Sequence, residues 1–268
     1  MSLSAEDFFA YTYAVLSAPG YVETFSEELT LPGPRLPITR DPALFARAVA
    51  LGRRLLWLHT YGERFLPPGA KRGQIPGGHA KCRTAIPSTP EGYPEEFSWQ
   101  ESDTARPGCD AGGAQGPASE STMNSSSHDQ SAGHGASQAG RAVSPSGLLR
   151  VGAGEFGPVP RVVWEFSVSG YEVVKGWLGF RMRERSGRKS SPLDALRPAA
   201  WTAALTTELL ELLWVLEATA AAQPELNSLL AEILAAPLFT AADFPTPTAA
   251  ERAAPGDVER ETQAAFNM

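Results

Sequence analysis

A long stretch rich in small and chain-breaking residues divides this sequence of 268 residues. Residues 67–157 contain 16 Gly, 9 Pro and 12 Ser. A segment of this composition buries too little apolar surface to offset the conformational entropy that ordering costs, so we expect disorder. The candidate globular parts that remain, 1–66 and 158–234, are together large enough for one ordinary domain with a core of its own.

The part before this stretch has a helical pattern. Apolar side chains recur at helical spacing, and proline and glycine separate the runs. Three helices are expected, over about 7–16, 21–29 and 41–59. The third has the clearest start, because Asp41 can cap the free amide groups and Pro42 suits the first helical turn.

The part after the stretch reads as short strands followed by helices. Strands are expected over 148–151 and 162–168, a strand leading into a helix over 171–183, and helices over about 201–220 and 225–235, separated by Pro224. The predicted class is α+β, in which a helical N-terminal part and a small β-sheet plus helices pack into one domain. The expected divisions are a helical part (1–66), a disordered insertion (67–147), a β-then-helical part (148–235) and a flexible acidic tail (236–268).

Several classes of protein are excluded by simple features. No apolar run reaches the roughly 18 residues that a membrane span needs. The first residues lack the basic start and apolar core of a signal peptide. Cys82 and Cys109 both lie in the stretch 67–157 that is expected to be disordered, so no disulfide framework is implied. We therefore expect a soluble, cytoplasmic protein.

Motifs for catalysis and cofactor binding are weak. Residues 152–157 match the glycine pattern G-x-G-x-x-G, but Pro158 and Pro160 follow where a helix would have to start, so we interpret the glycines as a tight turn. Three of the four histidines lie in the stretch that is expected to be disordered, and no other metal ligands stand at a suitable spacing from them. His59 is interpreted as a helix-terminal residue. No positioned nucleophile and base and no phosphate loop are found, so we expect no catalytic residue, cofactor or metal.

The basic residues concentrate in one region. Residues 161–197 hold eight basic and four acidic residues, whereas residues 198–268 hold two basic and ten acidic ones. The tightest cluster consists of Arg181, Arg183, Arg185, Arg188 and Lys189. These side chains could touch several DNA phosphates, each of which would add affinity by counterion release. A solvated loop between two helices is the competing interpretation.

Four tryptophans could suggest base stacking, but all four lie on apolar periodic faces. They are Trp164, Trp177, Trp201 and Trp214. Core packing is the better interpretation for each of them, and also for the leucine-rich helical face at 205–216.

Many separated blocks of the sequence resemble one known family. In the C-terminal part they are Gly152-x-Gly154-x-Phe156-x-Pro158, Val163-Trp164-Glu165-Phe166, Trp177-Leu178-Gly179-Phe180-Arg181 and Ser191-Pro192-Leu193-Asp194. In the N-terminal part they are Asp7-Phe8-Phe9-x-Tyr11-x-Tyr13, Pro34-Arg35-Leu36-Pro37 and Leu51-Gly52-Arg53. These blocks resemble, in the same order, the C-terminal specificity domain of type ISP restriction-modification enzymes.

The resemblance implies recognition of a DNA target beside an adenine methyltransferase. The catalytic motifs of the large enzymes, an Asn-Pro-Pro-Tyr-type adenine site, a methyl-donor loop and an ATPase loop, are missing from this sequence. We therefore expect a non-catalytic DNA-recognition module of a restriction-modification system. Its partners would be DNA and a DNA adenine methyltransferase or restriction subunit on another chain. The basic cluster would anchor phosphates, while the base-reading residues are not identified. The alternative is a truncated or repurposed protein-interaction module that does not bind DNA.

Overall fold

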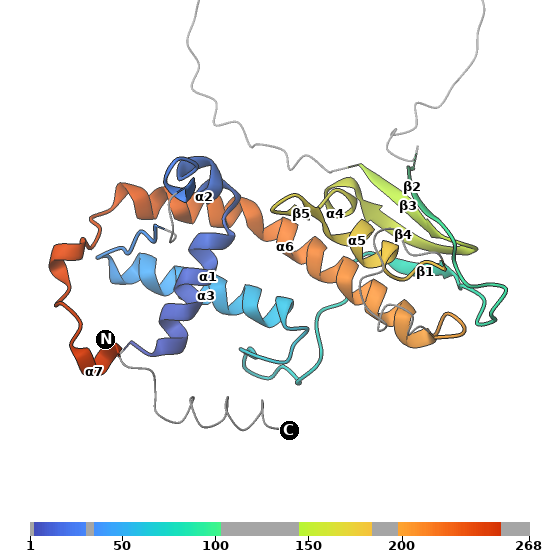
Figure 1. Ribbon diagram of the computed structural model, residues 1–268, viewed down its shortest axis with the longest axis horizontal. Helices are drawn as coiled ribbons and strands as arrows, with labels where there is room; N and C mark the ends of the chain where they lie inside the picture. The colour runs from blue at the N-terminus through green and yellow to red at the C-terminus, as the bar shows by residue number, and fades with distance from the viewer. Residues whose placement is uncertain (1–2, 31–34, 103–144, 184–197, 253–268) are drawn as a thin grey trace, which may run out of the picture. The chain divides into compact units, whose positions relative to one another are not determined.

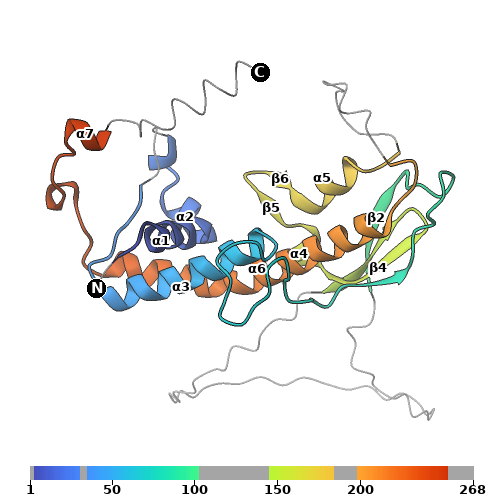
Figure 2. The ribbon, with the colours of Figure 1, turned by 90° about the horizontal axis from the view of Figure 1, so that it is seen from below.

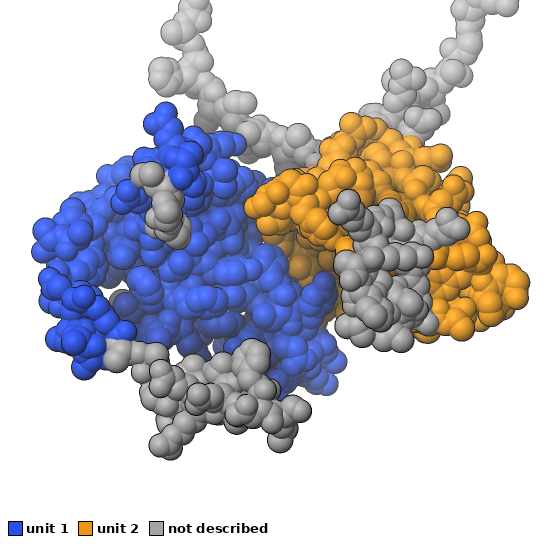
Figure 3. All heavy atoms as spheres, in the orientation of Figure 1, with its two compact units in different colours: residues 1–74, 221–268 blue, residues 75–220 orange. Residues whose placement is uncertain are grey.

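The computed structural model describes residues 3–30, 35–102, 145–183 and 198–252. The chain divides into two compact units (Figure 3), of which unit 1 comprises residues 1–74 and 221–268 and unit 2 comprises residues 75–220. Each unit has its own hydrophobic core. The α+β class expected from the sequence is confirmed. One long helix contributes its first half to the core of unit 2 and its second half to the core of unit 1.

Unit 1 is helical. Its elements are α1 (Ala5–Ser17), α2 (Pro19–Thr24), the 3-10 turn η1 (Glu28–Thr30), α3 (Pro42–His59), the end of α6 (Ala203–Ala235), the 3-10 turn η3 (Ala241–Asp243) and α7 (Ala249–Arg252). The predicted start of α3 is confirmed, since the Asp41 carboxylate accepts a hydrogen bond of 2.7 Å from the Ala43 amide. Ser4 and Asp7 form a reciprocal capping box at the start of α1.

The core of unit 1 is built where α1, α3 and the end of α6 meet. Tyr11 is completely buried, stacks on Phe45 with ring centroids 4.5 Å apart, and donates a hydrogen bond of 2.7 Å to the Pro37 carbonyl oxygen. The helices α1 and α3 approach each other closely at Ala10 and Gly52, where a side chain on Gly52 would overlap the Ala10 carbonyl group. The missing side chain therefore sets the distance between the two helices.

Unit 2 combines a small sheet with helices (Figure 1). Its elements are β1 (Lys81–Thr84), β2 (Phe97–Glu101), β3 (Ser146–Val151), β4 (Gly154–Pro160), α4 (Arg161–Trp164), β5 (Ser167–Val168), β6 (Tyr171–Glu172), α5 (Val173–Gly179) and the start of α6. The four longer strands form one antiparallel sheet in the order β1-β4-β3-β2, and β5 pairs with β6 in a separate hairpin. All four tryptophans interpreted as core residues lie in or against the core of this unit.

The strands β1 and β2 lie inside the stretch that we expected to be disordered, so that expectation was wrong for residues 81–84 and 97–101. The hairpin of β3 and β4 leaves two open edges, and each is paired by one of these strands. The average composition of a long stretch does not reveal single apolar residues that favour this pairing. Phe97 and Trp99 of β2 are such residues, and both pack against the core. Residues 103–144 of the expected insertion lie outside the described residues.

Two further elements differ from the expected ones. The predicted strand 162–168 is instead the helical turn α4 followed by the short strand β5, since the Glu165 amide bonds to the Arg161 carbonyl oxygen at 2.9 Å. The predicted tight turn is confirmed at Gly152 (φ 54°), between β3 and β4. The expected strand leading into a helix is also confirmed, as β6 and α5.

The helix α6 continues through Pro224, where the sequence predicted an end (Figure 2). Proline removes the hydrogen bond to the carbonyl group four residues earlier, that of Ala220, and its ring crowds the same carbonyl group. Buried side chains keep the helical register on both sides, with Leu213 and Leu216 in the core of unit 2 and Leu226 and Leu229 in that of unit 1. Packing therefore outweighs the lost hydrogen bond. None of the helices in the described part of the chain combines the length and apolar character that crossing a bilayer requires.

Candidate nucleic-acid interface

The four-stranded sheet has one buried apolar face and one polar face. The side chains on the buried face are fully covered and belong to Leu149, Val151, Phe156 and Val159. Successive side chains of a strand lie on opposite sides, so the residues between them face away from the core. We call this second surface the outer face, and its members are Arg83, Thr84, Ser98, Gln100, Leu148, Arg150 and Glu155. Arg83 and Thr84 are consecutive but both belong to it, because the register of β1 shifts between Cys82 and Thr84.

A polar row crosses all four strands of the outer face. In strand order it consists of Thr84 on β1, Glu155 on β4, Arg150 on β3 and Ser98 on β2, each paired with the next in the ladder. The Nε atom of Arg150 lies 3.3 Å from one carboxylate oxygen of Glu155. The hydroxyl group of Thr84 donates to the other oxygen at 3.5 Å. Glu155 is thus held between two neighbours.

Arg150 is oriented by this carboxylate but remains accessible. Its side chain is 50% exposed, while that of Glu155 is 32% exposed. Within the described residues, the two terminal nitrogens of Arg150 have no hydrogen-bond partner. The carboxylate thus lies beside Nε, and the terminal N–H donors of the guanidinium group are accessible to a ligand.

A second row lies beside the first and contains a glycine. Gln100 of β2 pairs with Leu148 of β3, and both face outward. At Gly157 of β4, an added Cβ atom would lie 3.1 Å from Leu148 and 3.7 Å from the Nε atom of Arg83. Arg83 therefore extends over backbone that carries no side chain. Its guanidinium group is exposed and has no ion-pair partner among the residues that the structure describes.

Arg181, a member of the predicted basic cluster, binds its own fold. Its guanidinium carbon lies 3.7 Å from the centroid of the Trp177 ring, and one terminal nitrogen donates to the Trp177 carbonyl oxygen at 3.3 Å. The other terminal nitrogen lies 3.2 Å from a carboxylate oxygen of Glu208 on α6. The side chain is only 29% exposed. Arg181 thereby links α5 to α6.

Arg183 has a similar structural role. Its guanidinium group donates to Glu95 at 2.7 Å and to the carbonyl oxygens of Pro90 and Glu91 at 2.6 and 3.0 Å. Its backbone amide donates to the Pro94 carbonyl oxygen at 2.7 Å. These bonds hold the loop before β2. The remaining members of the cluster, Arg185, Arg188 and Lys189, lie outside the described residues.

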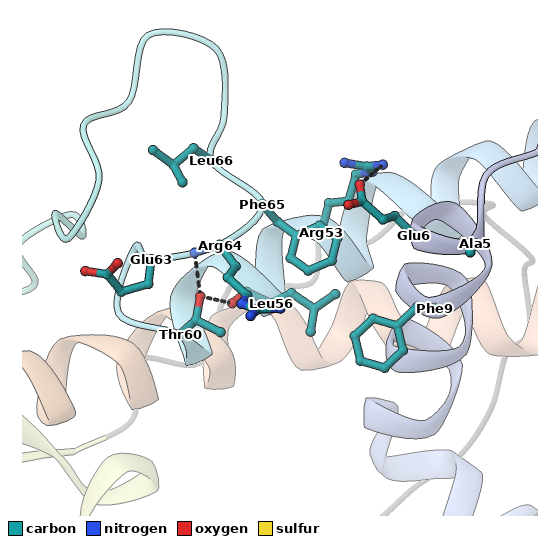
Figure 4. A pocket seen from close by; sticks show the side chains of 10 residues that line it. All are labelled: Ala5, Glu6, Phe9, Arg53, Leu56, Thr60, Glu63, Arg64, Phe65 and Leu66. Atoms are coloured by element: carbon teal, nitrogen blue, oxygen red, sulfur yellow. Dashed lines mark hydrogen bonds and ion pairs between the residues drawn. The ribbon is translucent and has the colours of Figure 1, made fainter. Parts of the chain in front are cut away.

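Unit 1 contains an amphipathic hollow of about 690 Å³ (Figure 4). It is lined by Ala5, Glu6, Phe9, Arg53, Leu56, Thr60, Glu63, Arg64, Phe65 and Leu66. The charge of Arg53 is balanced by Asp7 at 2.9 Å, and its guanidinium carbon lies 5.5 Å from the Phe65 ring centroid. The hollow is therefore amphipathic, since apolar side chains such as Phe9 and Leu66 line it together with charged ones.

A second, more apolar hollow of about 370 Å³ lies on unit 1. It is lined by Leu3, Phe8, Ile38, Thr39, Arg40, Pro42, Phe45, Phe239 and Phe244. Phe8 and Phe9 are neighbours in α1 and line different hollows, so the first turns of α1 contribute to both. Four exposed apolar side chains contribute to its lining, those of Leu3, Phe8, Phe239 and Phe244.

Two titratable groups of unit 1 lie in contact with each other. His59 is partly buried at the end of α3 and pairs with the Tyr13 hydroxyl group at 2.6 Å, and desolvation lowers the imidazole pKa. Burial also raises the pKa of the Tyr13 hydroxyl group. In the described ranges, no group of three His, Cys, Asp or Glu residues could hold a metal ion.

A family model, that of the type ISP C-terminal specificity domain, matches residues 1–212. The chain belongs to this family. The match covers most of the sequence and includes the outer face of the sheet, α1 and all residues that line the first hollow. No curated protein sequence matches this specificity domain.

Solved structures similar to the specificity domain are distant in sequence. A nuclease-deletion mutant of the type ISP restriction-modification enzyme LlaGI, in complex with a DNA substrate mimic, is 15% identical with a TM-score of 0.42, over 84% of this chain and 14% of that chain. The DrdV–DNA complex is 20% identical with a TM-score of 0.45, over 87% and 18%. The ATP-dependent type ISP enzyme LlaBIII bound to DNA is 14% identical with a TM-score of 0.44, over 85% and 11%. The specificity domain thus spans less than a fifth of each of these chains.

Sequence reasoning did not single out the residues of the outer face. Arg150 and Glu155 are separated by the turn at Gly152, and a two-residue hairpin places them opposite each other. The Gly152-Ala153 dipeptide between two apolar strands is the sequence signal that could have predicted this register. The roles of Arg83 and Gln100 depended on β1 and β2, which the sequence did not predict.

Proposed function

We propose that this specificity domain recognises a DNA target by placing the outer face of its sheet against duplex DNA, without catalysing a reaction itself. The observation that carries the proposal is the polar row centred on Arg150, which crosses all four strands and is surrounded by side chains that can donate to base edges. Arg, Gln and Ser are residues that read bases in the major groove, which admits β-structure. Membership of the family supports the same function.

We propose that phosphate contacts come from the basic segment that follows α5. Arg185, Arg188 and Lys189 remain the candidates for direct contacts, because their sequence places three cations within five residues. Arg181 and Arg183 are proposed to act mainly through position, since Glu208 and Glu95 already engage their guanidinium groups. They would hold in place residues 181–183, from which the chain continues into the basic segment. Because the chain has a net charge of −7, phosphate contacts must be local.

Binding measured against salt concentration tests this proposal. The full chain should bind duplex DNA, and the logarithm of the binding constant should fall linearly with the logarithm of the salt concentration. Changing Arg185, Arg188 and Lys189 together to alanine should reduce the magnitude of that slope by about 0.9 for each phosphate that the variant no longer neutralises. Arg72→Ala is the control, since Arg72 is exposed and paired with Glu63 in unit 1. Absence of DNA binding by the wild-type chain would overturn the proposed function.

We further propose that the chain acts with a DNA adenine methyltransferase or restriction subunit carried by another polypeptide. The two hollows beside α1 supply apolar surface suited to such a subunit. Phe9→Ser should weaken the complex and the methyl transfer that depends on it, while leaving DNA binding by the chain unchanged. Exposed Arg54→Ala on α3 serves as a control outside both hollows.

A second candidate function is a protein-interaction module without DNA binding. Exposed large apolar side chains favour it, because ten of the fourteen in the described residues belong to unit 1. Titration with random and selected duplexes separates the two functions. A chain that binds the catalytic subunit but no duplex at any salt concentration would support this second function.

A further inference from the structure

We infer that Arg150 reads a guanine base of the DNA target and that Glu155 positions it for this task. The inference rests on the proposed function and assigns the specificity of that same surface to one pair of residues. Its basis is the geometry of the guanidinium group, in which a neighbouring carboxylate engages Nε and leaves the terminal nitrogens to a ligand.

The chemistry of the two partners is complementary. Guanine presents two acceptors in the major groove, N7 and O6, at a spacing that the two terminal nitrogens of arginine match. Nε is not needed for this fork, so a carboxylate can hold it without competing with the base. Glu155 lies opposite Arg150 in the ladder and accepts a long hydrogen bond of 3.5 Å from Thr84. The carboxylate therefore favours arrangements in which Nε faces Glu155 and the terminal nitrogens face the ligand, which lowers the entropic cost of binding.

The charge of the surroundings favours duplex DNA as the occupant. Glu155 is the one carboxylate among the outer-face residues defined above, and Arg150 neutralises it. Arg83 adds a second exposed cation over the open backbone at Gly157. The outer face of the described strands thus keeps a net positive charge beside polar side chains, as a polyanion with hydrogen-bonding base edges requires.

Gln100 extends the reading surface in the same direction. It is exposed on the edge strand β2, two residue pairs along the ladder from Arg150 and on the same face as Arg83. A glutamine side chain pairs with adenine through N6 and N7. The structure therefore places Gln100 and Arg150 on adjacent strands of one face.

The test begins with selection of duplexes from a randomised pool by the full wild-type chain. Affinities are then measured for the selected duplex and for versions with each base pair replaced. Arg150→Ala should lose the preference for guanine at one position by roughly 5- to 150-fold. Binding to random duplex should weaken by a smaller factor, because the variant also loses one positive charge. Arg150→Lys should lose the same preference, because an ammonium group keeps the charge without the fork.

Glu155→Gln distinguishes positioning from general structural support. Loss of the carboxylate should weaken the guanine preference, while the removed negative charge should strengthen binding to random duplex. A variant that was simply unfolded would lose both, and thermal melting of each variant checks the fold. Arg47→Ala is the matched control, because Arg47 is exposed and paired with Glu232 in unit 1 and should leave the preference intact.

The outcomes separate this inference from the function on which it depends. If the wild-type chain selects a sequence and folded Arg150→Lys keeps the same preference, the role of Arg150 is overturned while DNA recognition stands. A uniform loss of affinity on all duplexes would mean that Arg150 binds a phosphate, and would also overturn the inference. If the wild-type chain selects no sequence, the proposed function fails first, and the inference with it.

Discussion

The indole nitrogen of Trp214 on α6 donates a hydrogen bond of 2.8 Å to the carbonyl oxygen of Ala80, the residue before β1. Ala80 is almost completely buried, so its carbonyl group has little access to water. The ammonium nitrogen of Lys81 lies 5.2 Å from the Trp214 ring centroid. One side chain of α6 thus fixes the start of a strand that composition alone would have left disordered.

Replacing Trp214 with phenylalanine should destabilise the chain, because the Ala80 carbonyl oxygen loses its donor. An unsatisfied buried polar group costs about 1–3 kcal/mol. Trp57→Phe is the matched control, since the indole nitrogen of Trp57 is buried without a hydrogen-bond partner in the described residues. Urea unfolding followed by circular dichroism should show a smaller loss for Trp57→Phe than for Trp214→Phe. Equal losses would mean that ring volume, not the hydrogen bond, decides.

Gly52→Ala should destabilise unit 1, although alanine normally stabilises a helix by about 0.5–1 kcal/mol relative to glycine. The new methyl group would overlap the Ala10 carbonyl group and force α1 and α3 apart. Overpacking of this kind costs about 1–3 kcal/mol. Thermal melting should therefore show a lower midpoint for Gly52→Ala. An unchanged or higher midpoint would contradict the close crossing of the helices.

Pro224→Ala should stabilise α6, because alanine restores the missing bond to the Ala220 carbonyl oxygen. Proline inside a helix is about 3 kcal/mol less favourable than alanine, and a gain of about 1–3 kcal/mol is expected. Pro224 is exposed, so little packing is lost. Denaturant unfolding measures the gain, with exposed Glu225→Ala as a control on the next residue. A loss of stability would mean that the proline is required where the helix passes from one core to the other.

Stability should decrease as the pH falls below about 6.5, the ordinary histidine pKa. Burial lowers the pKa of His59, so the folded state binds fewer protons there than the unfolded state. The contribution of His59 to the free energy of unfolding is therefore fully present above the unfolded-state pKa, and it is lost as the pH falls toward the folded-state pKa. Unfolding free energies measured between about pH 7.5 and 5.5 should fall less steeply in His59→Gln than in the wild-type chain. Parallel curves would contradict a buried neutral imidazole.

Local patterns in the sequence were sufficient for many elements. The start of α3 at Asp41–Pro42, the turn at Gly152 and the strand leading into α5 all follow from interactions within a few residues. Strands β1 and β2 could not be found in this way, because each gains its stability from pairing with a hairpin distant in the sequence. The continuation of α6 could not be predicted locally either. It depends on packing against residues far away in the sequence, and this packing outweighs the helix-breaking effect of Pro224.

The sequence by itself determined the family, the α+β class and the presence of a basic cluster, because motifs, periodicity and charge are local properties of the chain. Only the tertiary structure decided which groups each arginine contacts. It engages Arg181 and Arg183 in ion pairs with Glu208 and Glu95, and it places Arg150 on the outer face of β3 beside Glu155. An ion pair depends on which strands and helices become neighbours, and that choice is made by the packing of the whole unit.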